Sequence, residues 1–291
     1  MSTVELTRMP ATGPFHRRAA VGLLPWPGRA PRPETLPDSE LLLRNVTVDR
    51  DRLAAYDRVC GFRLTDTLPA TYLHVMAFPL ALQLMSAPDF PVPLVGLVHV
   101  ANRISLDWPI DAGQPVDLSV RAVDLRPHDR GQQFDVVATA AIDGVVAWLG
   151  VSTYLSREQR TTDGQRPAAA DRPAPPAATA RWQVDRRVGT DYARVSGDHN
   201  PIHTSRLGAR MFGFPRPIAH GMWSKARCLA AFAGRLPDAY TVDVSFKTPI
   251  TLPGTVAFST TADRDFTLYD ETSGKPHLIG SIRQDDLPVT E

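Results

Sequence analysis

Cysteine is scarce in this chain of 291 residues, and its scarcity limits the class of protein. The two cysteines, Cys60 and Cys228, cannot build a disulfide framework, and no C-x-x-C pair occurs. A reducing compartment suits such a chain, so we expect a cytoplasmic protein. No apolar run reaches the roughly 18 residues of a membrane span, and residues 1–18 lack the apolar core of a signal peptide. These absences predict a protein that neither enters a membrane nor is secreted.

An excess of charge of one sign is also missing. The 32 basic residues are balanced by 31 acidic ones, which argues against a protein built to neutralise nucleic-acid phosphates. No G-x-G-x-x-G fingerprint, G-x-x-x-x-G-K-[ST] loop or G-x-S-x-G elbow is present, which weakens a dinucleotide, nucleotide or serine-hydrolase interpretation. We therefore expect no cofactor and no nucleic-acid partner. Hydrophobic residues, at 43%, still provide for a sizeable core.

Proline, in contrast, is abundant, and 11 of its 27 residues are gathered in two stretches. The first stretch lies near the N-terminus and the second between residues 157 and 180, where large apolar side chains are almost absent. Such segments bury too little apolar area to offset the entropy of ordering them, so the second stretch indicates a linker, or alternatively a long surface loop. The predicted organisation is a proline- and arginine-rich tail (1–37), a first unit (38–156), a flexible linker (157–180) and a second unit (181–291).

The two units repeat one another. Seven of the fourteen residues from 48 to 61 are identical to those 136 positions later, including Tyr56 with Tyr192 and Gly61 with Gly197. Further similar residues occur in the same order in both units, which favours an ancient duplication. Each copy reads as a short strand, a short helix, a longer apolar helix and a meander of antiparallel strands. This order predicts an α+β fold in which two antiparallel sheets, each wrapped around a central helix, pack as a pseudo-dimer.

The hydrophobic patterns place these elements along the chain. In the first unit we expect a helix at Arg52–Val59 and strands at Leu41–Val48, Val95–Ile104, Pro115–Asp124, Gln133–Ile142 and Val145–Leu155. In the second unit we expect a helix at Thr190–Val195, a buried helix through Ala219–Ala233, and strands at Trp182–Val188, Thr241–Lys247, Gly254–Ala262, Phe266–Tyr269 and His277–Ile282.

The segment Tyr192–Ala226 concentrates residues that carry chemistry. Gly197 is suited to end the short helix, and Pro201 forces a rigid turn, so Asp198 and His203 are expected to point at one spot. The tripeptide His220-Gly221-Met222 lies in the first turn of the long helix, whose amides have no helical partner and carry the positive end of the helix dipole. Gly221 leaves room for a ligand to approach the backbone, which suits the stabilisation of a developing negative oxygen.

An acid/base pair beside such a helix start is what the addition of water to an α,β-unsaturated thioester requires. Asp198 and His203 could share one water and exchange base and acid roles, while the Gly221 N–H holds the thioester oxygen. The same groups would remove water from a 3-hydroxyacyl thioester.

Other interpretations of these residues remain open. Asp198 could cap a turn and His203 could be structural. His199, His203 and His220 could bind a metal with Asp198, but Pro201 prevents the first two histidines from sharing a helical face, so we predict no metal. Two residues of the long helix, Met222 and Trp223, are expected in the core, and two others, Lys225 and Arg227, on a solvated edge.

The residues from Ser196 to His203, followed by Gly213-Phe214 and by Pro217–Met222, resemble the motif of the MaoC-like family of (R)-specific enoyl-CoA hydratases and 3-hydroxyacyl-thioester dehydratases. The resemblance implies a double hot-dog fold and a catalytic pair, Asp198 and His203. It also implies that Asn200 supports the water site, that Gly221 faces the thioester carbonyl, and that Ser196 and His220 contribute to substrate binding. The implied reaction interconverts a trans-2-enoyl thioester of CoA or acyl carrier protein and its (3R)-hydroxyacyl product by adding or removing water.

The duplication assigns this chemistry to the second copy. The 136-residue shift places Phe62 opposite Asp198 and Thr67 opposite His203, so the first copy lacks both groups. We expect it to complete the sheet and build an acyl-chain tunnel, with the loop Ser86–Pro93 helping to set chain length. A hot-dog thioesterase and a non-catalytic acyl-binding subunit are the alternatives, and a homodimer is possible.

Overall fold

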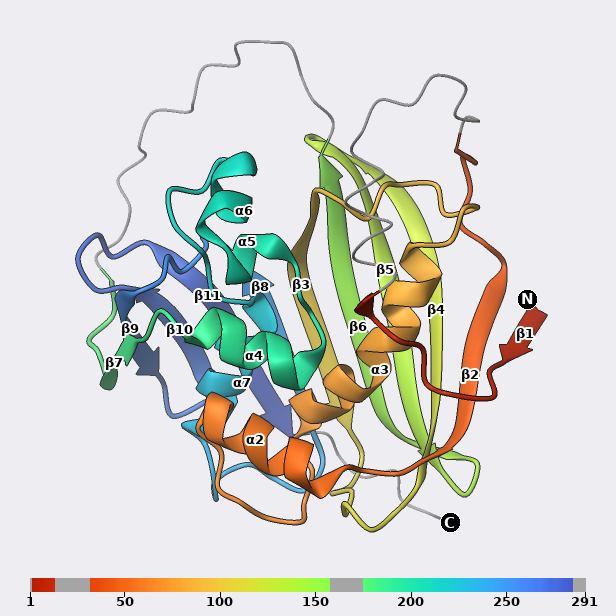
Figure 1. The fold of residues 1–291 in the computed structure, drawn as a ribbon. Helices are drawn as coiled ribbons and strands as arrows, with labels where there is room; N and C mark the ends of the chain where they lie inside the picture. The colour runs from red at the N-terminus through yellow and green to blue at the C-terminus, as the bar shows by residue number, and fades with distance from the viewer. Residues whose placement is uncertain (1, 14–31, 158–174, 285–291) are drawn as a thin grey trace.

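The computed structural model describes residues 2–13, 32–157 and 175–284 of the chain. Their strands form one 11-stranded sheet in the order β1-β2-β4-β5-β6-β3-β8-β11-β10-β9-β7. Figure 1 shows the helices gathered on one face of this curved sheet. Every strand pair is antiparallel except β1 with β2. Hairpins join β4 to β5 to β6 and β9 to β10 to β11, whereas β3 pairs with β6 and β8 with β11 across longer connections.

The first half of the sheet encloses a long apolar helix. Almost every side chain of this helix, α3, is buried, because sheet and helices surround it. The elements of this half are β1 (Ser2–Glu5), β2 (Ser39–Val46), α2 (Arg50–Cys60), α3 (Ala70–Met85), β3 (Leu97–Leu106), β4 (Val116–His128), β5 (Gly131–Ile142) and β6 (Val145–Arg157).

The second half repeats the plan with a shorter central helix, α7, followed by the remaining strands. Its elements are β7 (Ala180–Val184), α4 (Val188–Ser196), α5 (Pro201–Thr204), α6 (Arg206–Met211), α7 (Gly221–Ala230), β8 (Tyr240–Phe246), β9 (Gly254–Thr260), β10 (Asp265–Asp270) and β11 (Pro276–Gln284). No helix in the described ranges is long and apolar enough to cross a membrane.

The expected strands and short helices are present with shifts of a few residues at their ends. Three elements were not expected, namely β1, α5 and α6. The strand β1 extends the sheet at its edge by pairing with β2, so the N-terminal tail contributes to the fold. Residues 14–31 of the predicted tail and 158–174 of the predicted linker lie outside the described residues, and the unit boundaries stay predictions.

The two halves meet edge to edge, so the two expected sheets are joined into one. Strands β3 and β8 pair with Asn102 opposite Val244 and Ser105 opposite Thr241, whose hydroxyls lie 2.7 Å apart. Helices also bridge the halves, because the Trp223 indole N–H donates to the main-chain oxygen of Val59 at 2.9 Å. This junction brings strands and helices of both halves around one region, where the candidate site lies.

The structure corrects the expected exposure of Lys225 on α7. It was predicted on a solvated edge, but its side chain is fully buried. Its Nζ donates to the main-chain oxygen and the Oδ1 of Asn102 at 3.0 and 2.6 Å, and to the main-chain oxygen of Val242 at 3.1 Å. Arg227 is half-buried, with its guanidinium 4.2 Å over the Trp182 ring. Met222 and Trp223 are in the core, as predicted.

Candidate active site

Asp198 is held just beyond the end of α4. The helix ends because Gly197 adopts a left-handed backbone with φ of 79°. The Asp198 N–H then donates to the Ser196 hydroxyl at 3.2 Å, and the carboxylate accepts from the Asn200 N–H at 3.2 Å. The turn-capping contact considered from the sequence is therefore present, and it orients the carboxylate without burying it completely.

His203 lies on the single turn of α5, which Pro201 begins. The Asn200 side chain caps this turn by accepting from the Ile202 N–H at 3.3 Å. His203 is buried, and its Nδ1 lies 2.8 Å from the main-chain oxygen of Ile218. Because a carbonyl oxygen only accepts, Nδ1 carries the proton, which leaves the lone pair on Nε2.

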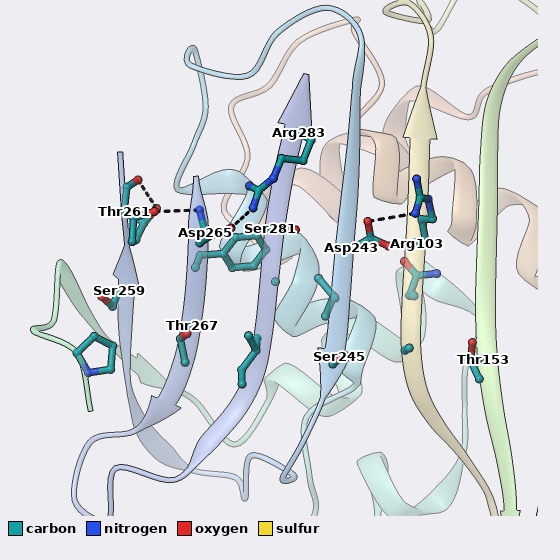
Figure 2. Close-up of a pocket in the computed structure, with 18 of the residues that line it drawn as sticks. Arg103, Thr153, Asp243, Ser245, Ser259, Thr261, Asp265, Thr267, Ser281 and Arg283 are labelled. Carbon is teal, nitrogen blue, oxygen red and sulfur yellow. Dashed lines mark hydrogen bonds and ion pairs between the residues drawn. The ribbon is translucent and has the colours of Figure 1, made fainter. Parts of the chain in front are cut away.

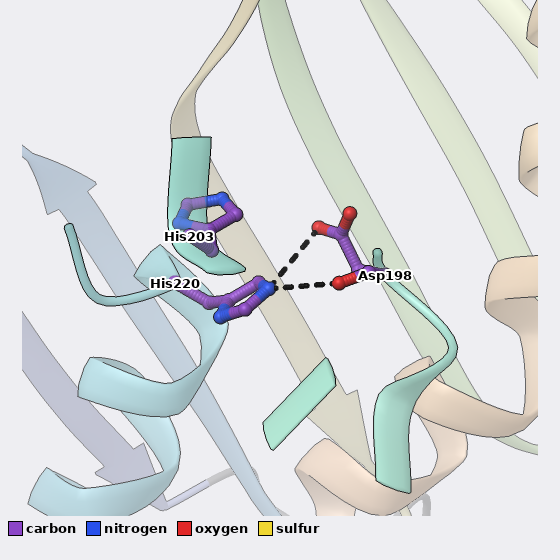
Figure 3. Close-up of side chains that lie close together, drawn as sticks. All are labelled: Asp198, His203 and His220. Atoms are coloured by element: carbon purple, nitrogen blue, oxygen red, sulfur yellow. Dashed lines mark hydrogen bonds and ion pairs between the residues drawn. The ribbon is translucent and has the colours of Figure 1, made fainter. Parts of the chain in front are cut away.

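His220, the residue before α7, joins the first two side chains (Figure 3). Ligand-capable atoms of Asp198, His203 and His220 all lie within 4.8 Å of one another, and the two imidazoles stack with centroids 3.7 Å apart. The His220 Nε2–H donates to the main-chain oxygen of Asp198 at 3.0 Å, and this nitrogen is 3.8 Å from the carboxylate. The structure thus brings Asp198 and His203 to one spot and adds His220 between them.

Burial keeps both histidines neutral. It lowers the pKa of His203, against the opposing effect of the Asp198 charge. Burial, and then the neighbouring His203, lowers the pKa of His220 to about 3. The Nδ1 of His220 is buried and has no hydrogen-bond partner within the described parts of the chain. At neutral pH the cluster therefore holds two neutral imidazoles beside the Asp198 carboxylate.

Gly221 begins α7 beside this cluster. No side chain of the described residues caps the helix, so its first amides remain available to a ligand at the positive end of the dipole. A Cβ at position 221 would lie 3.1 Å from the Phe246 ring, which is closer than an ordinary contact. Glycine is needed here because the backbone and the Phe246 ring approach one another closely.

The first half contributes side chains that the sequence did not single out. A chain of ring contacts leads away from Phe246 into that half, with centroid distances between 4.7 and 5.7 Å. His99, at its start, has an enclosed Nε2 with no partner among the described residues. Apart from Phe90, which lies in the predicted chain-length loop, nothing in the local sequence marks these residues, because only the tertiary fold brings their rings together. In order from the site they are Phe246, His99, Tyr154, Phe134 and Phe90.

A metal interpretation of the cluster can be tested on its hydrogen bonds. The three side chains are close enough to share an ion. However, the His220 nitrogen that faces Asp198 is protonated and donates to a main-chain oxygen, so a metal there would have to displace that bond. An acid/base interpretation needs no such rearrangement, and we keep it.

A separate hollow of about 710 Å³ lies on the sheet face away from the helices (Figure 2). Its charged residues are paired, with Arg103 and Asp243 3.5 Å apart and Arg283 next to Asp265. None of the predicted site residues lines it. It is not the candidate active site.

Known proteins share both the fold and the segment that carries this site. A model of the MaoC like domain matches residues 171–273. The 3-hydroxyacyl-thioester dehydratase X of Mycobacterium tuberculosis is 36% identical over 270 residues, which cover 91% of this chain and 95% of that protein. The crystal structure of HtdX from Mycobacterium tuberculosis has a TM-score of 0.76 and 33% identity, and the match covers 84% of this chain and 100% of that one.

A Mycobacterium tuberculosis protein with a double hotdog fold also matches, with a TM-score of 0.50, 14% identity, and 82% of this chain and 92% of that chain covered. The architecture is thus that of a double hot-dog protein, as predicted. This chain belongs to the MaoC-like dehydratase family.

Proposed function

We propose that this protein is a hydro-lyase that adds water to a trans-2-enoyl thioester, or removes it from a (3R)-hydroxyacyl thioester. The observation that carries the proposal is the convergence of Asp198 and His203 beside the uncapped start of α7. The relative that spans most of this chain is a 3-hydroxyacyl-thioester dehydratase, which supports the same reaction.

The hydrogen bonds suggest a role for each group. The lone pair of His203 Nε2 accepts one proton of the water as its oxygen bonds to C3. The electrons of the C2–C3 double bond move towards the thioester oxygen, which the Gly221 N–H stabilises. Asp198 accepts a hydrogen bond from the other O–H of the water, which stays on the oxygen, and stabilises the imidazolium. The imidazolium then returns its proton to C2, so the net change is the addition of one water and both residues are restored.

The other predicted site residues hold the catalytic segments in position. Ser196 accepts from the Asp198 N–H, and Asn200 caps α5, so each holds one of the catalytic segments. The side-chain oxygen of Asn200 is used by this cap, so the support that it gives to the water site is indirect. We assign to both residues, and to His220, the positioning of the catalytic pair.

The aromatic path into the first half supports a route for the acyl chain. Phe90 lies in the predicted chain-length loop and packs edge-on against Phe134 at 5.1 Å. At its other end the path reaches Phe246, which lies against Gly221. A thioester held by Gly221 would therefore direct its chain along rings of the first half, whose own copies of the catalytic residues are Phe62 and Thr67.

A hydration assay over enoyl-CoAs of increasing chain length tests the proposal. We expect loss of enoyl absorbance without release of free CoA, and a fall of at least about 100-fold in kcat for Asp198→Asn and for His203→Ala. Release of CoA would indicate a thioesterase. Wild-type turnover retained by both variants would contradict the assignment of the site. Oxidation of the product by an (S)-specific, rather than an (R)-specific, 3-hydroxyacyl-CoA dehydrogenase would contradict the stereochemistry.

A further inference from the structure

The short helix α6 presents an unusual surface. Leu207 and Met211 are 71% and 70% exposed, and their spacing of four residues puts them on the same face of the helix. Arg206 and Arg210 repeat the same spacing one position earlier, and both are exposed. We call these four residues the α6 patch. It combines two exposed large apolar side chains with two exposed cations.

The charges of the α6 patch have no internal counterpart. Neither Arg206 nor Arg210 makes an ion pair within the part of the chain that the structure describes. Besides the buried Lys225, residues 199–237 include five Arg but no Asp or Glu, although the whole chain is balanced at 32 basic and 31 acidic residues. A local positive field of this kind attracts an acidic partner.

The helix that carries the α6 patch packs against the helix that carries His203. A Cβ on Gly208 would lie 2.5 Å from the Cβ of Pro201, so α6 packs directly on the start of α5. Ser205 links the two helices, since it follows α5 and its hydroxyl accepts from the Gly208 N–H at 3.2 Å. His203 lies on α5, and Figure 1 shows α5 and α6 together at one end of the helical face.

We propose that the α6 patch is the docking surface for an acidic acyl carrier protein that delivers the thioester on its pantetheine arm. The inference rests on the proposed hydro-lyase function and names the carrier that this site prefers. Acidic side chains of the partner would pair with Arg206 and Arg210, and its apolar side chains would cover Leu207 and Met211.

The phosphates of CoA fit this surface less well. A phosphate binds best where several donors converge, whereas Arg206 and Arg210 are two exposed cations of one short helix. Phosphates also leave Leu207 and Met211 exposed to water, although burial of such side chains contributes about 25 cal/mol per Å² of apolar area. A protein surface satisfies both the cations and the apolar residues.

The test compares one enoyl group on three carriers: pantetheine alone, CoA and an acidic acyl carrier protein. For the wild type we expect kcat/KM on the carrier-protein thioester to exceed that on the pantetheine thioester by at least about 10-fold, and to fall as salt is raised. The double variant Arg206→Glu/Arg210→Glu should lose that advantage and keep its activity on the pantetheine thioester. The double variant Leu207→Ser/Met211→Ser should lower kcat/KM on the carrier-protein thioester and leave it unchanged on the other two substrates.

Arg63→Glu is the matched control. Arg63 is exposed and follows α2, which Figure 1 shows at the opposite end of the helical face from α6. We expect its activity on all three substrates to match that of the wild type.

Other outcomes overturn the proposal. An equal loss on the CoA thioester would assign the α6 patch to CoA phosphates, and dissociation of an oligomer by either double variant would assign it to a second copy. Unchanged activity on every substrate would leave it without a role in catalysis. Anisotropy of a labelled, unacylated carrier protein measures docking independently of turnover. A chain that binds it through the α6 patch without any hydration would refute the proposed function alone.

Discussion

At the scale of single residues, the site depends on a few atoms whose freedom is restricted by their neighbours. The tautomer of His203 is fixed by the Ile218 oxygen, and the Asp198 carboxylate is aimed by the Asn200 N–H. Both partners are main-chain groups, so substitution of their own side chains would leave these bonds in place. The catalytic atoms are therefore set by backbone geometry, which glycine and proline shape at positions 197 and 201.

Gly221→Ala tests the close approach at the start of α7. The new methyl group would press on the Phe246 ring and shift the amide that faces the thioester oxygen. Because loss of an oxyanion donor costs about 100-fold or more and here the donor is only displaced, we expect kcat to fall by roughly 10- to 100-fold. Steady-state hydration kinetics measure the effect. Gly13→Ala, where a Cβ would meet nothing within 4 Å, should retain wild-type kcat.

The pH dependence of hydration should report His203. The reaction needs its neutral imidazole, and burial lowers the pKa of this group from its usual value near 6.5. The neutral form consequently persists to lower pH, so kcat/KM should stay level as pH falls to 6.5 and decline only below that value. A profile of kcat/KM between pH 4.5 and 8 checks this. A decline that begins above pH 7 would show that His203 is not the base.

At the scale of elements, Lys225 connects the two halves through α7. Its three donors are used by oxygens of β3 and β8, which belong to different halves, and its position one turn after Gly221 ties the start of α7 to the sheet. Removal of a buried donor leaves these oxygens without a partner, and that cost exceeds the gain from a more apolar side chain.

Lys225→Met should therefore lower the free energy of unfolding by about 2–4 kcal/mol, as measured by urea denaturation. Because α7 loses its anchor, kcat should fall more than KM changes. The control is Lys275→Met, at an exposed position outside the regular strands, which should change stability by no more than about 0.5 kcal/mol. Equal stability of the two variants would show that the lysine contacts contribute nothing.

The elements were predictable wherever local pattern decides structure. Alternating strands and turn residues located β2 to β11, and the repeat of residues 48–61 indicated the duplication. The helix α6 was missed because its six residues carry no apolar period that faces the core. Lys225 was misplaced because a lysine in an apolar helix reads as exposed. Only the oxygens of Asn102 and Val242, distant in the sequence, make its burial possible.

Part of the candidate site was likewise predictable from the sequence, and part of it was not. Asp198, His203 and Gly221 belong to one continuous segment, and the geometry of that segment follows from its glycines and prolines. His99 and Tyr154 come from strands of the other half, and their contribution depends on how β3 pairs with β8. No local pattern encodes such a pairing.

At the scale of the whole molecule, neutral histidines enclosed between the halves make folding sensitive to acid. The pKa is lowered to about 4 for His74 and to about 3 for His99 and His220, in each case mainly by burial. In the unfolded chain these groups titrate near 6.5, so between about pH 6.5 and 4 the unfolded state binds more protons than the folded state. The free energy of unfolding must then decrease as pH falls through this range.

His99→Phe separates this effect from the titration of carboxylates. Phenylalanine keeps a ring against Tyr154 and Phe246, whose centroids lie 4.7 and 5.0 Å from that of His99, but it binds no proton in the unfolded chain. Thermal unfolding at pH 7.5, 6.5, 5.5 and 4.5 should show a smaller loss of Tm for this variant than for the wild type. His128→Phe, at the exposed end of β4, serves as the control and should follow the wild type. If Tm falls by the same amount in all three proteins between pH 6.5 and 4.5, protonation of His99 in the unfolded state does not contribute to acid unfolding.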